Sequence, residues 1–158
     1  MREGIRNMIG SKFFLPLKKI TRRFFWELGL NGIATDNAQK GEYGEWLARR
    51  HLRKKGYLLI AENWRSKRNH RLEIDLIFRD QEMLVFVEVR ARSSKSFVTG
   101  YDSINQKKRI NLSHAFKAYL REESNIPNNY RFDVVEIDLA NSKRDSNKIF
   151  HHENIAIF

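Results

Sequence analysis

Three acidic side chains stand inside two apolar stretches of the sequence, where a carboxylate is costly to bury. Glu73 and Asp75 interrupt the stretch LEIDLIF at residues 72–78, and Glu88 lies in the stretch MLVFVEVR at residues 83–90. A charged group in such surroundings needs a compensating partner, and a divalent cation is the strongest local one. Carboxylates, water and a phosphate oxygen suit Mg²⁺, which prefers oxygen ligands. We therefore predict a metal site that uses Asp75 and Glu88.

The polar residues RDQE at 79–82 separate the two apolar stretches, so together they predict a β-hairpin. Side chains alternate between the two faces of a strand, and Glu88 therefore shares a face with Arg90. If the turn places the acidic faces of both strands on the same side, Asp75 and Glu88 converge as a carboxylate pair. The alternative is a solvated strand face on which Glu88 makes an ordinary ion pair with Arg90 or Arg92.

The composition limits the class of protein and its partners. The chain has 158 residues, of which 41% are hydrophobic, so it is long enough for one domain with its own core. It contains no cysteine, which excludes a disulfide framework and a thiolate metal site. The formal net charge of +11 indicates a polyanionic partner, either nucleic acid or an anionic membrane surface. The alternative is a basic protein without such a partner.

Residues 1–39 are predicted to form a basic amphipathic extension in which apolar residues recur at helical spacing, interrupted by Pro16. The segment lacks both a membrane-spanning apolar run and a signal-peptide cleavage site, so we predict a cytoplasmic protein. It has three interpretations: peripheral membrane contact through residues 1–30, a helix docked on the domain, or a basic arm on nucleic acid. We favour a docked or loosely ordered extension, joined to the domain by a linker at residues 31–39.

Residues 40–158 predict an α/β domain. Helices are expected over residues 41–55 and 103–121, and the basic residues before Gly56 mark the end of the first. Besides the two halves of the hairpin, strands are expected at residues 57–64, 131–139 and 149–158, the last as an edge strand. The order of the main elements is helix, three strands, helix, strand, which is a small α/β arrangement with helices packed against a sheet.

Basic residues surround the predicted carboxylate pair. Four of them lie in the loop directly before the hairpin, where a phosphate backbone would have to run to reach the carboxylates. Others follow the hairpin or lie at the start of the helix over residues 103–121. The predicted nucleic-acid contacts are Arg65, Lys67, Arg68, Arg71, Arg92, Lys107 and Lys108.

An ordered set of motifs runs through the predicted domain. The main ones are GEYGExxA at residues 41–48, EIDLI at 73–77, VFVEVxxR at 85–92 and RFDVV at 131–135. In this order they resemble the bacterial YraN family, which is similar to archaeal Holliday-junction resolvases and belongs to the PD-(D/E)xK nuclease superfamily. The resemblance implies a small restriction-endonuclease-like core, in which helices flank a mixed sheet.

The resemblance also implies an activity: an endonuclease that depends on Mg²⁺ or Mn²⁺ and hydrolyses phosphodiester bonds of structured or branched DNA. It is consistent with a homodimer. Position by position, Asp75 and Glu88 correspond to the metal ligands of the superfamily, and Glu45 corresponds to the helix carboxylate that helps to hold a metal-bound water. Such an ion polarises the phosphodiester and lowers the pKa of a bound water.

One catalytic position departs from the superfamily pattern. The residue two places after the glutamate is normally lysine, and here it is Arg90. Arginine keeps its proton and presents a planar fork in place of a point charge, although it can still stabilise charge on a phosphate. Lys108 is a second candidate for the missing ammonium group, or else a phosphate contact. The alternative function is therefore a DNA- or RNA-binding module with a nuclease fold and little or no catalysis.

Overall fold

The computed structural model of the protein describes residues 17–28, 36–93, 104–124, 127–140, 142 and 145–157. The chain divides into two compact units, Met1–Gly32 and Ile33–Phe158. The described part of the first unit is α1 (Leu17–Glu27), in which Trp26 is buried whereas Phe24 and Phe25 are exposed. The other residues of the predicted extension up to Pro16 lie outside the described ones. None of the helices in these ranges is long and apolar enough to cross a membrane.

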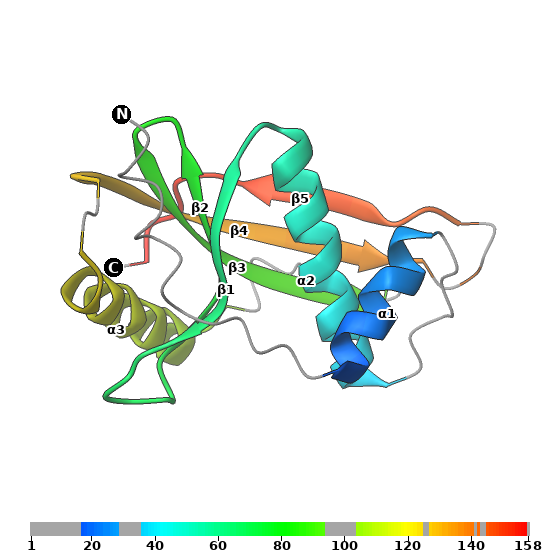
Figure 1. Ribbon diagram of the computed structural model, residues 1–158, viewed down its shortest axis with the longest axis horizontal. Helices are drawn as coiled ribbons and strands as arrows, with labels where there is room; N and C mark the ends of the chain where they lie inside the picture. The colour runs from blue at the N-terminus through cyan, green and yellow to red at the C-terminus, as the bar shows by residue number, and fades with distance from the viewer. Residues whose placement is uncertain are drawn as a thin grey trace. The chain divides into compact units, whose positions relative to one another are not determined.

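The second unit contains one five-stranded sheet whose strands lie in chain order (Figure 1). All neighbouring strands are antiparallel except β3 and β4, which are parallel and are connected through α3 (Gln106–Glu122). The mixed sheet and the hairpin predicted from the sequence are both confirmed. The strands are β1 (Leu58–Arg65), β2 (Glu73–Asp80), β3 (Met83–Ser93), β4 (Asn129–Leu139) and β5 (Lys148–His152).

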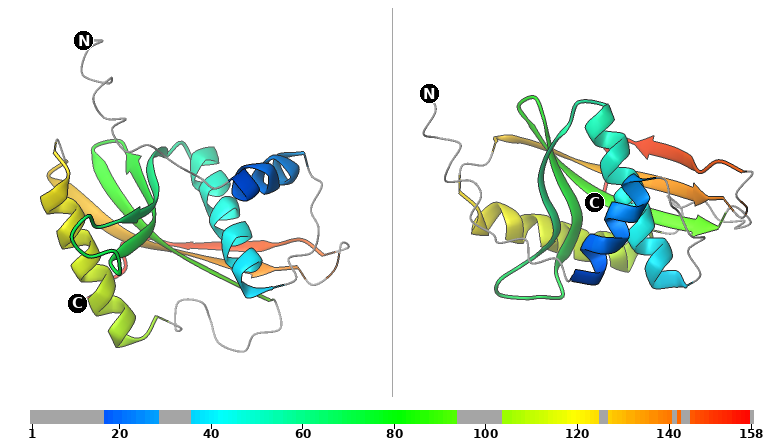
Figure 2. Two further views of the ribbon diagram at one scale, coloured as in Figure 1. Left: turned by 60° about the horizontal axis from the view of Figure 1, so that its bottom comes forward. Right: turned by 45° about the vertical axis from the view of Figure 1, so that its right-hand side comes forward.

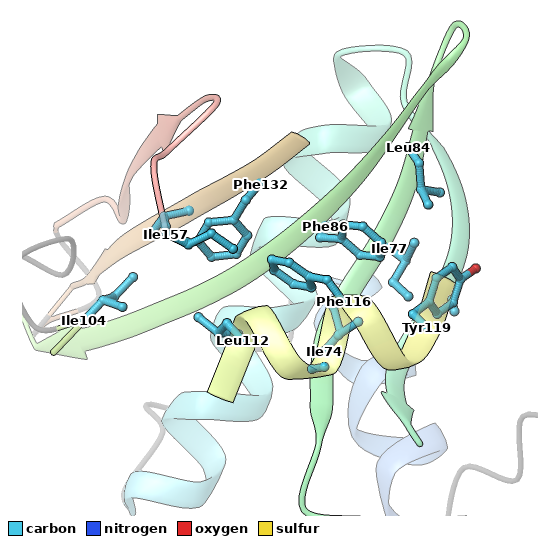
Figure 3. Packing of buried hydrophobic residues seen from close by; sticks show 13 residues of the cluster. Ile74, Ile77, Leu84, Phe86, Ile104, Leu112, Phe116, Tyr119, Phe132 and Ile157 are labelled. Carbon is cyan, nitrogen blue, oxygen red and sulfur yellow. The ribbon is translucent and has the colours of Figure 1, made fainter. Parts of the chain in front are cut away.

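Two helices cover the two faces of this sheet, α2 (Asn37–Lys54) on one and α3 on the other (Figures 1 and 2). Successive side chains of β3 point to opposite faces of the sheet, so Val85 and Val87 pack with α2 whereas Phe86 packs with α3. Phe86 stacks on Phe116 of α3, with 4.5 Å between the ring centroids (Figure 3). Burial on both faces explains why β3 is an almost unbroken apolar run in the sequence.

The first helix of the domain starts earlier than predicted. α2 begins at Asn37, whereas the sequence pattern placed its start at residue 41 and a linker at residues 31–39. The reason is an N-terminal cap: the Asp36 carboxylate accepts a hydrogen bond of 2.7 Å from the backbone N–H of Gln39. Such a cap satisfies one of the N–H groups that the first helical turn leaves without a partner. The predicted linker was therefore wrong for its last residues.

The terminal strand is shorter than predicted. β5 ends at His152, whereas the sequence pattern extended an edge strand over residues 149–158. Asn154 has a φ of +53° and donates its backbone N–H to the Asp133 carboxylate, which interrupts the regular pairing with β4 before the Ile155 N–H bonds the Phe132 carbonyl at 2.7 Å. The turn delivers Ile157 into the core on the α3 side, as Figure 3 shows. After this irregularity the end of the chain is therefore held both by a backbone hydrogen bond to β4 and by burial of Ile157.

A buried polar network ties β4 to its neighbours. Asp133 is fully buried and accepts from Arg131 Nε at 3.1 Å and from His151 Nε2 at 2.9 Å. The Arg131 guanidinium also reaches the Tyr57 hydroxyl at 2.6 Å and Asp80 at 3.2 Å. The pairing of Arg131 with Asp133 gives the RFDVV motif a structural role on β4.

Replacement of this buried acid, Asp133→Asn, should cost roughly 3 kcal/mol of unfolding free energy at pH 7, because it leaves buried cationic donors without their anion. Burial alone would raise the pKa of Asp133, but hydrogen bonds from His151, from the Asn154 N–H and from Arg131 hold that pKa below its usual value. A lowered pKa stabilises the fold above the unfolded pKa of about 4, and this contribution is lost as the pH falls through the folded pKa.

Urea unfolding from pH 7 downward checks the prediction. The difference between wild type and Asp133→Asn should narrow below about pH 4. Asp145→Asn is the matched control, because Asp145 is exposed, and it should change stability by less than about 0.5 kcal/mol. A difference that stays constant across the pH range would contradict the assigned role of the charge.

Candidate active site

Asp75 lies where the two strands of the hairpin stop pairing. The last described pair of the β2–β3 ladder is Leu76 with Val87, and Asp75 and Glu88 are the next residues on their strands. At this point the Asp75 carboxylate accepts a hydrogen bond of 2.8 Å from the backbone N–H of Val89. A side chain thus replaces the backbone acceptor that continued pairing would supply, and it holds the carboxylate in a fixed orientation.

Glu88 is buried on the face of β3 that α3 covers, with only 2% of the residue exposed. Its Oε1 atom lies 2.9 Å from Lys108 Nζ and 3.4 Å from Arg90 Nη2. Its Oε2 atom is buried and has no hydrogen-bond partner among the residues that the structure describes. The structure therefore brings Asp75, Glu88, Arg90 and Lys108 to one place, and the ion pair with Arg90 considered from the sequence is present too.

The surroundings favour the neutral forms of both carboxylates. Burial raises the pKa of Glu88 to about 7, the nearby Asp75 raises it as well, and Lys108 and Arg90 oppose the increase. Burial also raises the pKa of Asp75, against the opposing effects of the Val89 N–H and of Lys108. Two acids that share a low-dielectric site cannot both ionise cheaply. A divalent cation between them would reverse this preference.

The donor set fits a hard divalent cation. The buried Oε2 atom of Glu88 offers an acceptor without a partner, and Asp75 uses only Oδ2 in its described hydrogen bond. The part of the chain that the structure describes contains no cluster of three or more histidine, aspartate or glutamate side chains suited to a metal ion. The two carboxylates would therefore share a cation with water, backbone carbonyl or substrate oxygens, as Mg²⁺ sites commonly do.

Glu45 is placed by α2 and not by the hairpin. It is half-buried and accepts a hydrogen bond of 3.1 Å from Asn63 Nδ2 on β1. Asn63 has a φ of +52° within that strand, which directs its side chain toward the helix. This contact accounts for the position of Glu45, whose part in metal binding stays a prediction of the resemblance.

Arg92 has carboxylate partners on β4. Its Nε lies 2.9 Å from Asp138, and its Nη2 pairs with Glu136. Burial lowers the pKa of Arg92, but the hydrogen bond that Arg92 donates to Asp138 and the charge of Glu136 outweigh burial and raise this pKa. The parallel register sets Arg90 beside Glu136 and Arg92 beside Asp138. The charges that alternate along the two strands indicate these ion pairs in the sequence, but the sequence analysis did not predict them.

The predicted basic loop is held by an acid that the sequence analysis also missed. Glu122, at the end of α3, accepts from the Ser66 hydroxyl at 2.6 Å and from the Lys67 N–H at 2.9 Å. The Ser66 hydroxyl in turn accepts from the N–H groups of Arg68 and Asn69. The loop is therefore built around a buried serine, and it leaves several cations exposed. These are Lys67, Arg68 and Arg71, together with Arg65, which pairs with Glu73 at 2.7 Å.

The fold and the site define a small α/β protein with a five-stranded mixed sheet, of the kind found in nuclease-like cores, and with a buried carboxylate pair beside two cations. The profile of the uncharacterised protein family UPF0102 matches residues 44–137. The chain belongs to this family, which is the YraN family that its motifs resemble.

Relatives that the chain matches over most of their own length support the membership. A UPF0102 protein of Carboxydothermus hydrogenoformans is 36% identical over 121 residues, which cover 75% of this chain and 95% of that protein. One of Clostridium acetobutylicum is 33% identical over 118 residues, covering 75% of this chain and 93% of that protein. One of Pseudomonas fluorescens is 42% identical over 101 residues, covering 63% and 82%. These relatives therefore share most of their length with this chain.

Proposed function

We propose that the protein is a Mg²⁺-dependent endonuclease that hydrolyses phosphodiester bonds in structured or branched DNA. The observation that carries the proposal is the buried Oε2 atom of Glu88, an acceptor without a partner beside a second carboxylate, Asp75. A buried acceptor of this kind is costly unless a ligand completes it. Mn²⁺ is an alternative ion, because it also accepts oxygen ligands.

Each residue of the site has a defined task in this proposal. Glu88 and Asp75 hold the ion, and the Val89 N–H keeps the Asp75 carboxylate oriented. When bound, the ion polarises the phosphodiester and lowers the pKa of an attacking water. Lys108 supplies the ammonium group that the superfamily carries on the strand, because its Nζ already lies 2.9 Å from Glu88. Arg90 stabilises the negative charge that develops on the phosphate.

Cleavage assays on linear, flapped and four-way-junction DNA, with Mg²⁺, Mn²⁺ or a chelator, test the proposal. We expect metal-dependent cutting by the wild type. Arg90→Lys, which restores the superfamily pattern, should cut at least as fast because lysine supplies a compact charge at that position. Arg79→Lys is the matched control, since Arg79 binds the hairpin turn at Gln81 and Glu82. Its rate should equal that of the wild type.

A second candidate function is a DNA- or RNA-binding module without catalysis. The observation that favours it is that two cations of the same chain already pair with Oε1 of Glu88, so part of the charge of the site is balanced without a metal ion. Binding without cutting, with both metals and on every substrate, would support this function over the nuclease. Cutting that appears only in Arg90→Lys would identify an intact site apart from that residue.

The basic loop between β1 and β2 is the proposed contact with the DNA backbone. Replacing Lys67, Arg68 and Arg71 by serine should weaken binding to all DNA sequences about equally, because phosphate contacts carry no sequence information. If each residue neutralises one phosphate, the slope of log K against log salt should fall in magnitude by up to about 3. Fluorescence anisotropy over a salt series measures this slope.

Arg50, Arg53 and Lys54 of α2, replaced by serine together, are the charge-matched control. This triple variant removes the same net charge from α2, which covers one face of the sheet while α3 covers the other. This control should leave the slope nearly unchanged. Equal losses of slope in the two triple variants would mean that the loop is not the contact and that only the net charge of the protein matters.

A further inference from the structure

With both carboxylates ionised, as binding of a metal ion requires, the candidate site is electrically neutral by its own residues. Asp75 and Glu88 contribute two negative charges when ionised, and Arg90 and Lys108 contribute two positive ones. Both cations approach the same oxygen, Oε1 of Glu88, at 3.4 and 2.9 Å. The second oxygen, Oε2, makes no hydrogen bond with the described part of the chain. One side of a single buried carboxylate therefore holds two cations, while the other side holds none.

A divalent cation changes this balance. An ion bound by Asp75 and Glu88 brings the site from neutral to a surplus of two positive charges, and such a surplus is costly where Glu88 is 2% exposed. The metal also competes directly with Lys108 and Arg90 for the charge of Glu88. Both effects are relieved if the two cations leave Glu88 for another anion, and the phosphates of a nucleic acid supply one.

We propose that Lys108 and Arg90 are transferable counter-cations: binding of a divalent metal ion displaces them from Glu88, and they then bind the phosphates of the nucleic acid. This inference rests on the proposed function, because it assigns the metal to Asp75 and Glu88. It adds that metal binding and DNA binding strengthen each other through these two side chains. Such coupling is reciprocal, since each ligand must change the affinity for the other by the same factor.

The positions of the two cations suit this transfer. The side chains of Lys108 and Arg90 are 29% and 31% exposed, whereas that of Glu88 is 3% exposed. The cations thus lie between the buried acid and solvent, where a phosphate would arrive. Arg90 Nε is itself buried and has no acceptor within the described ranges, so its guanidinium retains a donor that Glu88 does not use. A lysine stem rotates freely, and its movement requires no change in α3.

Binding measurements with Ca²⁺ test the proposal without relying on cleavage. The protein is titrated with Ca²⁺ by calorimetry, and with a four-way DNA junction by fluorescence anisotropy in the presence and absence of Ca²⁺. For the wild type we expect Ca²⁺ to strengthen DNA binding about tenfold, within the usual range of coupling between two sites. Lys108→Met should bind Ca²⁺ several-fold more tightly without DNA, because a competing cation is gone, and should gain less DNA affinity from Ca²⁺.

Lys107→Met is the matched control, because it removes the same charge from the adjacent, exposed position of α3. This variant should lose DNA affinity equally with and without Ca²⁺ and keep wild-type affinity for Ca²⁺. Lys108→Arg, which preserves the positive charge, should retain most of the coupling between Ca²⁺ binding and DNA binding that Lys108→Met loses. If Lys108→Met does not fold, as judged by circular dichroism, Arg90→Met replaces it with the same expected changes.

The possible failures are distinguishable. If Asp75→Asn leaves Ca²⁺ binding unchanged and the wild type cuts no DNA, the proposed metal site is wrong and this inference falls with it. If Asp75→Asn abolishes Ca²⁺ binding, but Lys108→Met shows wild-type affinity for Ca²⁺ and wild-type coupling, only the transfer is overturned. Tighter Ca²⁺ binding together with weaker coupling in Lys108→Met supports the transfer.

Discussion

Asp75→Asn should reduce metal-dependent cleavage by about 100-fold or more and, at the same time, make the metal-free protein more stable. Asparagine keeps the shape of the side chain, and its carbonyl oxygen can still accept the hydrogen bond from the Val89 N–H. The variant therefore removes the charge and little else. The loss of activity follows from the loss of an anionic ligand for the metal ion.

The gain in stability follows from the sign of the pKa shifts. Burial raises the pKa values of Asp75 and Glu88, the latter from 4.5 to about 7, so the fold disfavours their ionised forms. A raised acid pKa means that the native state loses stability as the pH rises from the unfolded pKa through the folded one. For Glu88 that interval runs from pH 4.5 to about 7, and the shift corresponds to up to about 3 kcal/mol.

Urea unfolding in the presence of a chelator, from pH 5 to about pH 8.5, measures this effect, with the range chosen to span the folded pKa of Glu88. The unfolding free energy of the wild type should fall as the pH rises across this range, and that of Glu88→Gln and Asp75→Asn should fall less. Glu82→Gln, in the exposed hairpin turn, is the control and should follow the wild type. Added Mg²⁺ should stabilise the wild type at high pH and leave both site variants unchanged. Variants less stable than the wild type at high pH would contradict the assigned cost of the two charges.

The sequence predicted the parts of the site that depend on short stretches of chain. The hairpin and its acids are visible because strand alternation and an apolar run are local signals, and the structure brings Asp75 and Glu88 together as expected. The cap of α2 is also a local signal, an Asp36 three residues before Gln39, but the predicted helix begins at residue 41. The residue that caps the helix is therefore visible in the sequence.

Other contacts could not be predicted because they depend on register between distant segments. The sequence offered Lys108 as a candidate, but its distance to Glu88 is set by how α3 crosses the sheet. Glu122 shows no motif, yet it anchors the basic loop through Ser66, from which it is separated by 56 residues. The pairing of Arg92 with Asp138 likewise needs the parallel register of β3 and β4. Tertiary geometry, and not residue type, decides these interactions.

The close approach of α2 to β3 makes a second strong prediction. Gly44→Ala should destabilise the protein by about 2 kcal/mol, the usual cost of overpacking a filled interior. A Cβ atom at position 44 would lie 2.3 Å from the Cβ atom of Ala91, a distance at which the helix must move away from the strand. In an exposed helix the same exchange stabilises, because alanine loses less backbone entropy than glycine. A loss of stability in Gly44→Ala would therefore show that α2 packs closely against β3 at this position.

Two further variants separate packing from helix propensity. Gly41→Ala lies in the same helix with nothing within 4 Å of its added Cβ, so it should stabilise the protein by about 0.5–1 kcal/mol. Ala91→Gly removes the atom that Gly44→Ala strikes, so the double variant should recover much of the lost stability in a double-mutant cycle. Strict additivity of the two changes, measured by urea unfolding, would show that the helix does not rest on β3 at this point. Because Glu45 follows Gly44 directly, a displaced helix would also move this predicted helix carboxylate. The double variant should therefore recover cleavage as well as stability.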